Sequence, residues 1–353
     1  MPTLFDPLQV GALTLPNRVI MAPLTRCRAG AGRVPTDLNV EYYVQRASAG
    51  LILTEATAVD PMGVGYFDTP GIWSEEQVAG WKRITAGVHA AGGRISLQLW
   101  HVGRMSDPVH LDGAMPVAPS AIAPPGHPSG IRPQKPFETP RALDRREIPG
   151  VIAAYRRGAE NAQRAGFDGV ELHGANGYLI DQFLQDSTNK RTDDYGGPIE
   201  NRARFALEAT DAAISIWGAD RVGMHLNPRS SAHGMGDSDP AATFGYLARE
   251  LGQRKIAFIC ARESLEEPRL VPLIKREFGG VMIANQGFTA ADAQRVLDAG
   301  EVDAVAWGRI FIANPDLPRR LQLGAPLNEP DESTFYGDGP RGYTDYPTMS
   351  EIG

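Results

Sequence analysis

The sequence of 353 residues contains only two cysteines, Cys27 and Cys260, which lie far apart along the chain. So few cysteines exclude a disulfide framework and favour a reducing compartment, which predicts a cytoplasmic protein. No cysteine or histidine residues have the spacing of a zinc site, and the His-Glu-x-x-His pattern is absent. The sequence therefore predicts no bound metal.

Long hydrophobic runs and an excess of positive charge are also missing. No apolar run reaches the length needed to cross a membrane, and the N-terminal residues lack a basic region followed by an apolar one. The formal net charge is −7 and the pI is about 5.6, whereas nucleic-acid binding requires clustered lysine and arginine. We therefore expect small-molecule partners, and neither nucleic acid nor membrane. The expected oligomeric state is a monomer or a homodimer.

The sequence does contain a regular alternation of short apolar runs and longer amphipathic segments. The apolar runs, read as strands, are 18–24, 51–58, 94–99, 169–173, 222–227, 255–260, 280–284 and 304–307. The helical patterns fall at about 39–48, 75–91, 146–165, 198–217, 240–252, 267–278, 289–299 and 314–322.

Strands that are apolar on both faces and separated by helices predict a parallel sheet covered by helices. Eight such repeats close a (β/α)8 (TIM) barrel, and the length suits this α/β fold as a single domain over residues 1–353. An open, doubly wound sheet is the alternative, but it usually carries a Gly-x-Gly-x-x-Gly fingerprint after the first strand. The first run here ends in Pro23-Leu24 and is followed by Thr25-Arg26, and the fingerprint is absent from the sequence.

Two segments interrupt the alternation. Residues 105–145 follow the third strand and are so rich in proline and glycine that a long helix is excluded. A loop of this length in a compact domain is typical of a lid, so we expect a capping insertion, and a disordered segment is the alternative. The C-terminal tail, 324–353, is rich in aromatic residues without helical or strand periodicity, and we expect it to pack on the barrel or line its mouth.

The carboxyl ends of barrel strands carry the catalytic groups in this fold. Here they carry amides, hydroxyls and small residues, with no carboxylate cluster for a metal and no Ser-His-Asp order. Such a surface suits a neutral heterocycle with many ring heteroatoms. The loops after the seventh and eighth strands add glycines and Arg309 at the usual phosphate position of barrels.

The fourth strand ends in a motif with three chemically useful side chains, His173, Asn176 and Tyr178. Two neutral donors can hold a carbonyl oxygen, and a phenol beside them can deliver a proton. Each residue alone is an ordinary loop residue, but their shared position at a strand end predicts a catalytic site.

Several longer motifs resemble the Old Yellow Enzyme family almost from end to end. They include PNRVIMAPLTR at 16–26, LQLWHVGR at 97–104, ELHGANGY at 171–178, NKRTDDYGG at 189–197 and GYTDYP at 342–347. The chain resembles the classical branch, which includes N-ethylmaleimide reductase and the xenobiotic reductases. These are FMN-dependent ene-reductases that oxidise NADPH or NADH. The resemblance implies that reduced FMN passes a hydride to the β-carbon of an α,β-unsaturated carbonyl compound or nitroalkene.

The resemblance also implies a role for individual residues. Catalysis falls to His173 and Asn176, which bind the activating oxygen, and to Tyr178, which protonates the α-carbon. Residues expected to bind noncovalent FMN are Pro23, Leu24, Thr25, Ala56, Gln98, His173, His225, Gln286, Gly287, Gly308 and Arg309. Residues expected to line the substrate pocket are Tyr66, Trp100, His173, Asn176, Tyr178 and Tyr336.

One position departs from the family pattern. His225 stands where most relatives carry an arginine beside the flavin pyrimidine ring. Arginine is always charged, whereas histidine can be neutral at neutral pH. The sequence therefore does not identify the group that stabilises the negative charge of the reduced flavin.

Two other functions remain possible on the sequence alone. A barrel aldolase or isomerase could use the same phosphate loops, but it would need a strand-end lysine or carboxylate base, and Lys255 opens the sixth predicted strand at the wrong end. A barrel that binds FMN without reductase activity is the other alternative.

Overall fold

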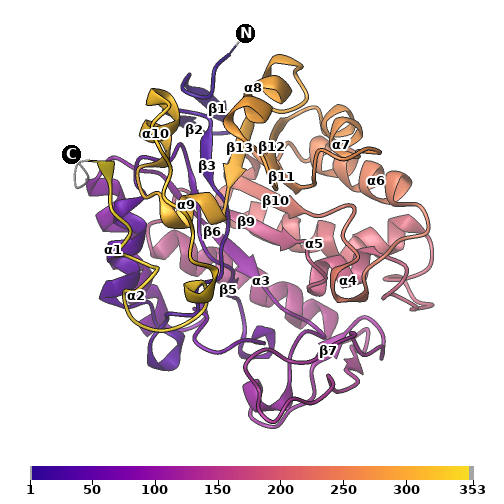
Figure 1. Cartoon of the computed structure of the whole chain (residues 1–353). Helices are drawn as coiled ribbons and strands as arrows, with labels where there is room; N and C mark the ends of the chain where they lie inside the picture. The colour runs from indigo at the N-terminus through magenta and orange to yellow at the C-terminus, as the bar shows by residue number, and fades with distance from the viewer. Residues whose placement is uncertain (1, 350–353) are drawn as a thin grey trace.

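The computed structural model describes residues 2–349, and its centre is a closed barrel of parallel strands (Figure 1). The barrel strands are β3 (Val19–Met21), β4 (Ile52–Leu53), β6 (Ile95–Trp100), β9 (Gly169–Gly174), β10 (Val222–Leu226), β11 (Phe258–Arg262), β12 (Val281–Asn285) and β13 (Ala304–Trp307). The barrel closes because β3 pairs with β4 and β13, and β4 pairs with β6. The predicted (β/α)8 barrel is therefore confirmed, and the open-sheet alternative is wrong.

Helices surround this barrel in the order expected from the sequence (Figure 1). They are α1 (Asp37–Gln45), α2 (Glu75–Ala90), α3 (Ile148–Arg164), α5 (Ile199–Trp217), α6 (Pro240–Gln253), α7 (Val271–Phe278), α8 (Ala290–Asp298) and α10 (Leu317–Leu323). Two short helices, α4 (Leu179–Leu184) and α9 (Arg309–Ala313), were not expected. Both follow directly on predicted site residues, at the carboxyl ends of β9 and β13.

The inside of the barrel is apolar over part of its circumference. Ile20, Leu53, Phe258 and Ile283 belong to one buried cluster with residues of an N-terminal hairpin, β1 (Leu8–Val10) and β2 (Leu13–Leu15). The hairpin is tied to the start of β10, because Ala12 N–H donates to the Asp220 carbonyl at 2.9 Å. It therefore closes the amino end of the barrel and leaves the carboxyl end available for a ligand.

Three predicted strands have boundaries that the structure corrects, and the reasons are local. The strand β3 ends at Met21, close to Pro23, which has no N–H to donate. The predicted strand 51–58 is split into β4 and β5 (Thr57–Ala58), because hydroxyl groups of Thr54 and Thr57 donate to the Glu55 carbonyl in place of a strand partner. The predicted strand 255–260 begins too early, since Lys255 has a φ of 57° and β11 starts only at Phe258.

The segment 105–145 contains a short 3₁₀ helix (Pro108–His110) and a parallel pair, β7 (Val117–Ala118) and β8 (Arg141–Ala142). Arg191 fastens it by donating to the Pro119 carbonyl at 3.0 Å and to the Leu143 carbonyl at 2.6 Å. Val117 and Leu143 are buried in the main apolar core.

Two buried arginines in the first βα loop hold the C-terminal tail. Arg26 donates to the carbonyls of Phe335 and Gly342, at 3.0 and 2.7 Å, and Arg28 donates to the Thr334 carbonyl at 3.0 Å. Tyr343 stacks on Tyr42 of α1, with ring centroids 4.0 Å apart, so the tail packs on the barrel as expected (Figure 1). The last part of the expected tail, residues 350–353, lies outside the described residues.

Candidate active site

Polar side chains from β6, β9 and β10 meet inside the carboxyl end of the barrel. Gln98 donates through Nε2 to Glu171 Oε2 at 2.8 Å, and Glu171 Oε1 lies 3.2 Å from Nδ1 of His225. His225 is also the register partner of His173 on the neighbouring strand. All four side chains are buried, and Gln98, Glu171 and His225 form a connected polar network beside His173.

His173 presents a neutral ring whose orientation is fixed. Its Nδ1 accepts from the Ala175 N–H at 3.3 Å, which leaves Nε2 as the N–H donor of a neutral imidazole. Burial and then the neighbouring His225 hold the pKa of His173 well below its usual range. The ring is therefore a neutral donor at neutral pH.

Asn176 is oriented just as firmly. Its Oδ1 accepts from Asn227 Nδ2 at 2.8 Å and from Arg262 Nη1 at 3.0 Å. Because arginine can only donate, the oxygen of the Asn176 amide must face Arg262, and the Nδ2 group is left for a ligand. The backbone is left-handed at this residue, with a φ of 57°, which asparagine tolerates better than most residues.

Tyr178 lies in an aromatic group together with Tyr66 and Trp100. Its ring stands edge-on to Trp100 and to His173, with centroids 5.0 Å apart in both pairs. The hydroxyl groups of Tyr178 and Tyr66 are 3.0 Å apart, close enough for a proton to pass between them. Burial raises the pKa of Tyr178 well above its usual range, and that of Tyr66 to about 12, so both phenols stay protonated.

The expected flavin-edge and phosphate residues also gather at this end of the barrel. Pro23, Leu24 and Thr25 follow β3, and Ala56 lies in the break between β4 and β5. Gln286 and Gly287 follow β12, while Gly308 precedes Arg309 at the start of α9. The Arg309 guanidinium is exposed and pairs with Glu332 at 2.6 Å. Tyr336, the sixth expected pocket residue, is 69% exposed on the tail.

These residues fit FMN by their chemistry. Gln98 uses its amide nitrogen on Glu171, so its oxygen remains an acceptor for a ring N–H. Within residues 2–349, no hydrogen bond engages the Thr25 hydroxyl or the backbone N–H groups of Gly287 and Gly308. Free N–H groups beside an arginine are the groups that a phosphate requires.

The network also contains a group with potential metal ligands. Glu171, His225 and Cys260 bring one ligand atom each within 4.8 Å of one another. Burial raises the pKa of the Cys260 thiol well above its usual range, which disfavours the thiolate that a metal would require. We therefore assign no metal to this group.

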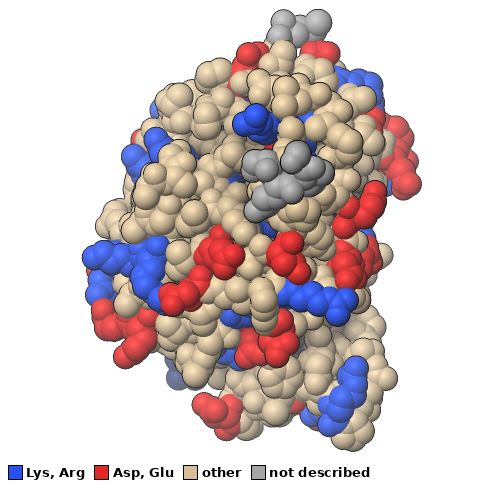
Figure 2. All heavy atoms as spheres, turned by 60° about the vertical axis from the view of Figure 1, so that its left-hand side comes forward, with Lys and Arg blue, Asp and Glu red and all other residues tan. Residues whose placement is uncertain are grey.

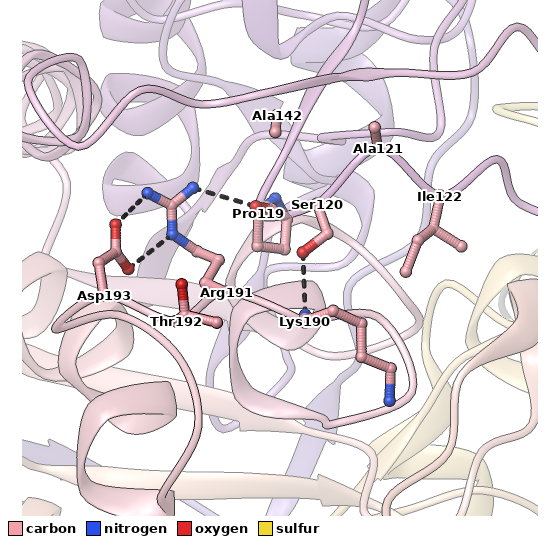
Figure 3. Close-up of a pocket in the computed structure, with 9 residues that line it drawn as sticks. All are labelled: Pro119, Ser120, Ala121, Ile122, Ala142, Lys190, Arg191, Thr192 and Asp193. Atoms are coloured by element: carbon pink, nitrogen blue, oxygen red, sulfur yellow. Dashed lines mark hydrogen bonds and ion pairs between the residues drawn. The ribbon is translucent and has the colours of Figure 1, made fainter.

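Two cavities border the 105–145 segment. One, of about 320 Å³, reaches Tyr66 and is lined by Gly65, Tyr66, Met105, Pro125, Gly126, His127, Ser129, Phe137 and His233. The other, of about 480 Å³, lies between the segment and residues 190–193, where Arg191 pairs with Asp193 (Figure 3). None of the expected site residues lines this second cavity, so only the first adjoins the aromatic group.

Sequence reasoning missed four residues of the site: Glu171, Asn227, His233 and Arg262. His233 lies 2.7 Å from the Asn176 carbonyl through Nδ1, and it comes from a loop that carries no motif. Arg262 was missed because the predicted sixth strand stopped at Cys260, whereas β11 continues to Arg262 and delivers it to the site. A correct boundary for that strand was the only signal that could have identified it.

The comparisons with known proteins identify the family of this chain. The NADH:flavin oxidoreductase / NADH oxidase family matches residues 3–328. The chain is 43% identical to 12-oxophytodienoate reductase 1 of Oryza sativa subsp. japonica, over 99% of this chain and 94% of the relative. It is 44% identical to a probable flavin mononucleotide-dependent alkene reductase of Leishmania infantum, over 98% and 97% of the two chains.

Solved structures are equally similar. Morphinone reductase in complex with tetrahydroNAD superposes with a TM-score of 0.96 at 51% identity, over 99% of this chain and 98% of that one. The Old Yellow Enzyme homologue from Zymomonas mobilis gives a TM-score of 0.96 at 46% identity, over 98% and 99%. The chain therefore belongs to the NADH:flavin oxidoreductase / NADH oxidase family. It is an FMN-dependent ene-reductase that takes its electrons from a nicotinamide dinucleotide.

The molecular surface is consistent with a small-molecule enzyme. On the face shown in Figure 2, lysine and arginine alternate with aspartate and glutamate, without a continuous basic stripe. Among residues 2–349, no helix is both long and apolar enough to cross a membrane.

Proposed function

We propose that this enzyme reduces alkenes activated by a carbonyl or nitro oxygen, which is held by His173 Nε2 and Asn176 Nδ2. The observation that carries the proposal is the fixed orientation of both groups: each has its acceptor atom occupied by a protein donor and its N–H free. Bound FMN supplies hydride transfer in this chemistry. The two donors withdraw electron density from the alkene and thereby make its β-carbon electrophilic.

Proton delivery falls to the Tyr178 hydroxyl. Hydride addition at the β-carbon leaves a carbanion at the α-carbon, and the phenol O–H supplies the proton that completes the reduction. Tyr66, 3.0 Å away, can return a proton to the Tyr178 oxygen. Trp100 and Tyr66 have nearly parallel rings, with centroids 5.6 Å apart, and provide an apolar wall for the substrate.

We further propose that NADPH or NADH and the alkene use the same site in turn. The sequence carries no fingerprint of a separate dinucleotide fold. The decisive experiment is anaerobic titration of the yellow holoenzyme with each nicotinamide, followed by an enone and a nitroalkene. Bleaching by the nicotinamide and recovery of the colour on adding the alkene are expected. A protein that binds FMN but does not bleach would leave only the ligand-binding alternative.

The aldolase or isomerase alternative lacks the strand-end lysine that its chemistry would require. Lys255 is exposed before the start of β11, at the amino end of the barrel, and so lies away from the site. Membership of the flavin oxidoreductase family excludes this alternative independently.

The remaining features concern the molecule as a whole. We propose a single domain over residues 1–353 in which the 105–145 insertion caps the substrate pocket, because Met105, Pro125 and Phe137 of this insertion line the cavity that reaches Tyr66. The proposed compartment is the cytoplasm, which is supported by the free thiols of Cys27 and Cys260. The oligomeric state, monomer or homodimer, is a matter for sedimentation analysis of the holoenzyme.

Arg309→Ala is expected to weaken FMN binding by about tenfold or more, because a charge-assisted contact with the phosphate is worth about 1.5–3 kcal/mol. The dissociation constant can be measured by quenching of FMN fluorescence on titration with the apoprotein. Glu332→Gln is the matched control, since it removes the exposed ion-pair partner of Arg309 and leaves the guanidinium in place. Unchanged affinity in Arg309→Ala would contradict the assignment of the phosphate site.

A further inference from the structure

Arg262 is an arginine without a carboxylate partner at the mouth of the site. It ends β11, and among the described residues it forms no ion pair. Its guanidinium instead makes two neutral contacts, from Nη1 to Asn176 Oδ1 at 3.0 Å and from Nε to Gln286 Oε1 at 2.8 Å. A carboxylate is a stronger acceptor than an amide, yet this guanidinium donates to two neutral amide oxygens.

The second contact leads to a strained residue. Gln286 has a φ of 101°, in a region that side-chain-bearing residues rarely adopt. It lies in the loop expected to hold the FMN phosphate, directly before Gly287. Arg262 therefore connects the strained phosphate loop to the amide that is expected to hold the substrate oxygen.

The first contact has a chemical consequence. When a cation donates to the oxygen of an amide, it draws electron density from the nitrogen, and the N–H group becomes a stronger donor. Asn227 also donates to Asn176 Oδ1, at 2.8 Å, but it is neutral and leaves only Arg262 as a source of charge. The charge of Arg262 would thus reach the substrate oxygen through the amide of Asn176, without direct contact.

We propose that Arg262 is a positioning residue for alkene reduction, which orients and polarises the Asn176 amide so that its Nδ2 group binds a partly negative oxygen. This rests on the proposed role of Asn176. The Gln286 contact holds the guanidinium in place from the opposite side. The positive charge favours substrates in which negative charge accumulates on the activating oxygen as hydride arrives.

The first test compares Arg262→Gln with Arg262→Lys in the FMN-loaded enzyme. The neutral variant is expected to lose about tenfold in kcat/KM for an enone, and to bind p-hydroxybenzaldehyde about tenfold more weakly in an absorbance titration of the oxidised enzyme. Lysine keeps the charge but has one donor group in place of the fork, so an intermediate result is expected. Arg276→Gln, an exposed site on α7, controls for the loss of one charge.

The second test separates positioning of Asn176 from support of the phosphate loop. Arg262→Gln is expected to have little further effect on phenol binding and kcat/KM in an Asn176→Ala background, because the amide through which it acts is gone. Gln286→Gly removes the contact on the loop side and is expected to weaken FMN binding, so it shows how much of any loss in Arg262→Gln comes from the phosphate loop. Equal effects of Arg262→Gln in both backgrounds, or a loss confined to FMN affinity, would overturn the proposal.

The roles of Asn176 and Arg262 are tested separately by these variants. If Asn176→Ala leaves phenol binding and enone reduction unchanged, the proposed role of Asn176 is wrong. If Asn176→Ala impairs both and Arg262→Gln and Arg262→Lys impair neither, only the role of Arg262 is wrong. Should Arg262→Gln fail to fold, the Arg262→Lys variant alone decides, since wild-type phenol affinity and kcat/KM would contradict the orientation of Asn176 by the two contacts of the guanidinium.

Discussion

Tyr178→Phe is expected to reduce the rate of enone reduction by about 10²–10⁴-fold, the usual contribution of a general acid. The rate falls because the substitution removes the hydroxyl that donates the proton. The edge-on contacts of the ring with Trp100 and His173 remain, so the rest of the site is unchanged. Reduction of the enzyme by the nicotinamide requires no proton from this group and is expected to change little. Anaerobic stopped-flow measurements follow the two half-reactions separately through the flavin absorbance.

A nitroalkene provides the internal control for this variant. Its product anion is stable enough to leave the site and take its proton from water, so Tyr178→Phe should impair nitroalkene reduction less than enone reduction. Tyr66→Phe is the matched variant, since it removes the neighbouring hydroxyl at 3.0 Å but keeps Tyr178. If Tyr178→Phe slowed both half-reactions equally, the phenol would be a structural group and not the proton donor.

His173→Ala is expected to reduce the rate of enone reduction by about 10²-fold, as does the loss of one donor from an oxyanion site. Phenol binding to the oxidised enzyme should weaken in parallel, because the same Nε2 group is lost. His173→Asn restores a neutral donor and should recover part of both losses. Wild-type affinity and rate in His173→Ala would show that the ring does not contact the substrate oxygen.

The pH dependence gives a second measurement for this residue. The pKa of His173 lies well below its usual range, so the ring gains no proton between about pH 6 and pH 8. The ratio of kcat/KM between the wild type and His173→Asn is therefore expected to stay constant across that window. A ratio that falls as the pH drops toward 6 would mean that the ring becomes charged and loses its fixed tautomer.

The barrel could be predicted from the sequence because its strands are apolar on both faces, a pattern that follows directly from burial between helices. The grouping of the candidate site residues could be predicted because His173, Asn176 and Tyr178 lie within six positions of one chain segment. Residues that are this close in sequence can be grouped without knowledge of the contacts that other strands make.

The partners of these residues could not be predicted in the same way. The pairing of Glu171 with His225 depends on the register between β9 and β10, and periodicity does not give a register. The contact of Arg262 with Asn176 joins positions 86 residues apart, across a strand whose end was misplaced by two residues. Long-range contacts of this type orient the site, and they appear only in the folded structure.

The hydrogen bonds from Arg26 and Arg28 to the tail have a consequence for synthesis of the enzyme. Their guanidinium groups bind the carbonyls of residues 334, 335 and 342, which leave the ribosome more than 300 residues after the arginines themselves. Until then, these buried cations lack the acceptors that compensate for their burial. The loop that contains Pro23 and Thr25 is thus completed only after residues 334–342 have been made, and firm flavin loading should follow their synthesis.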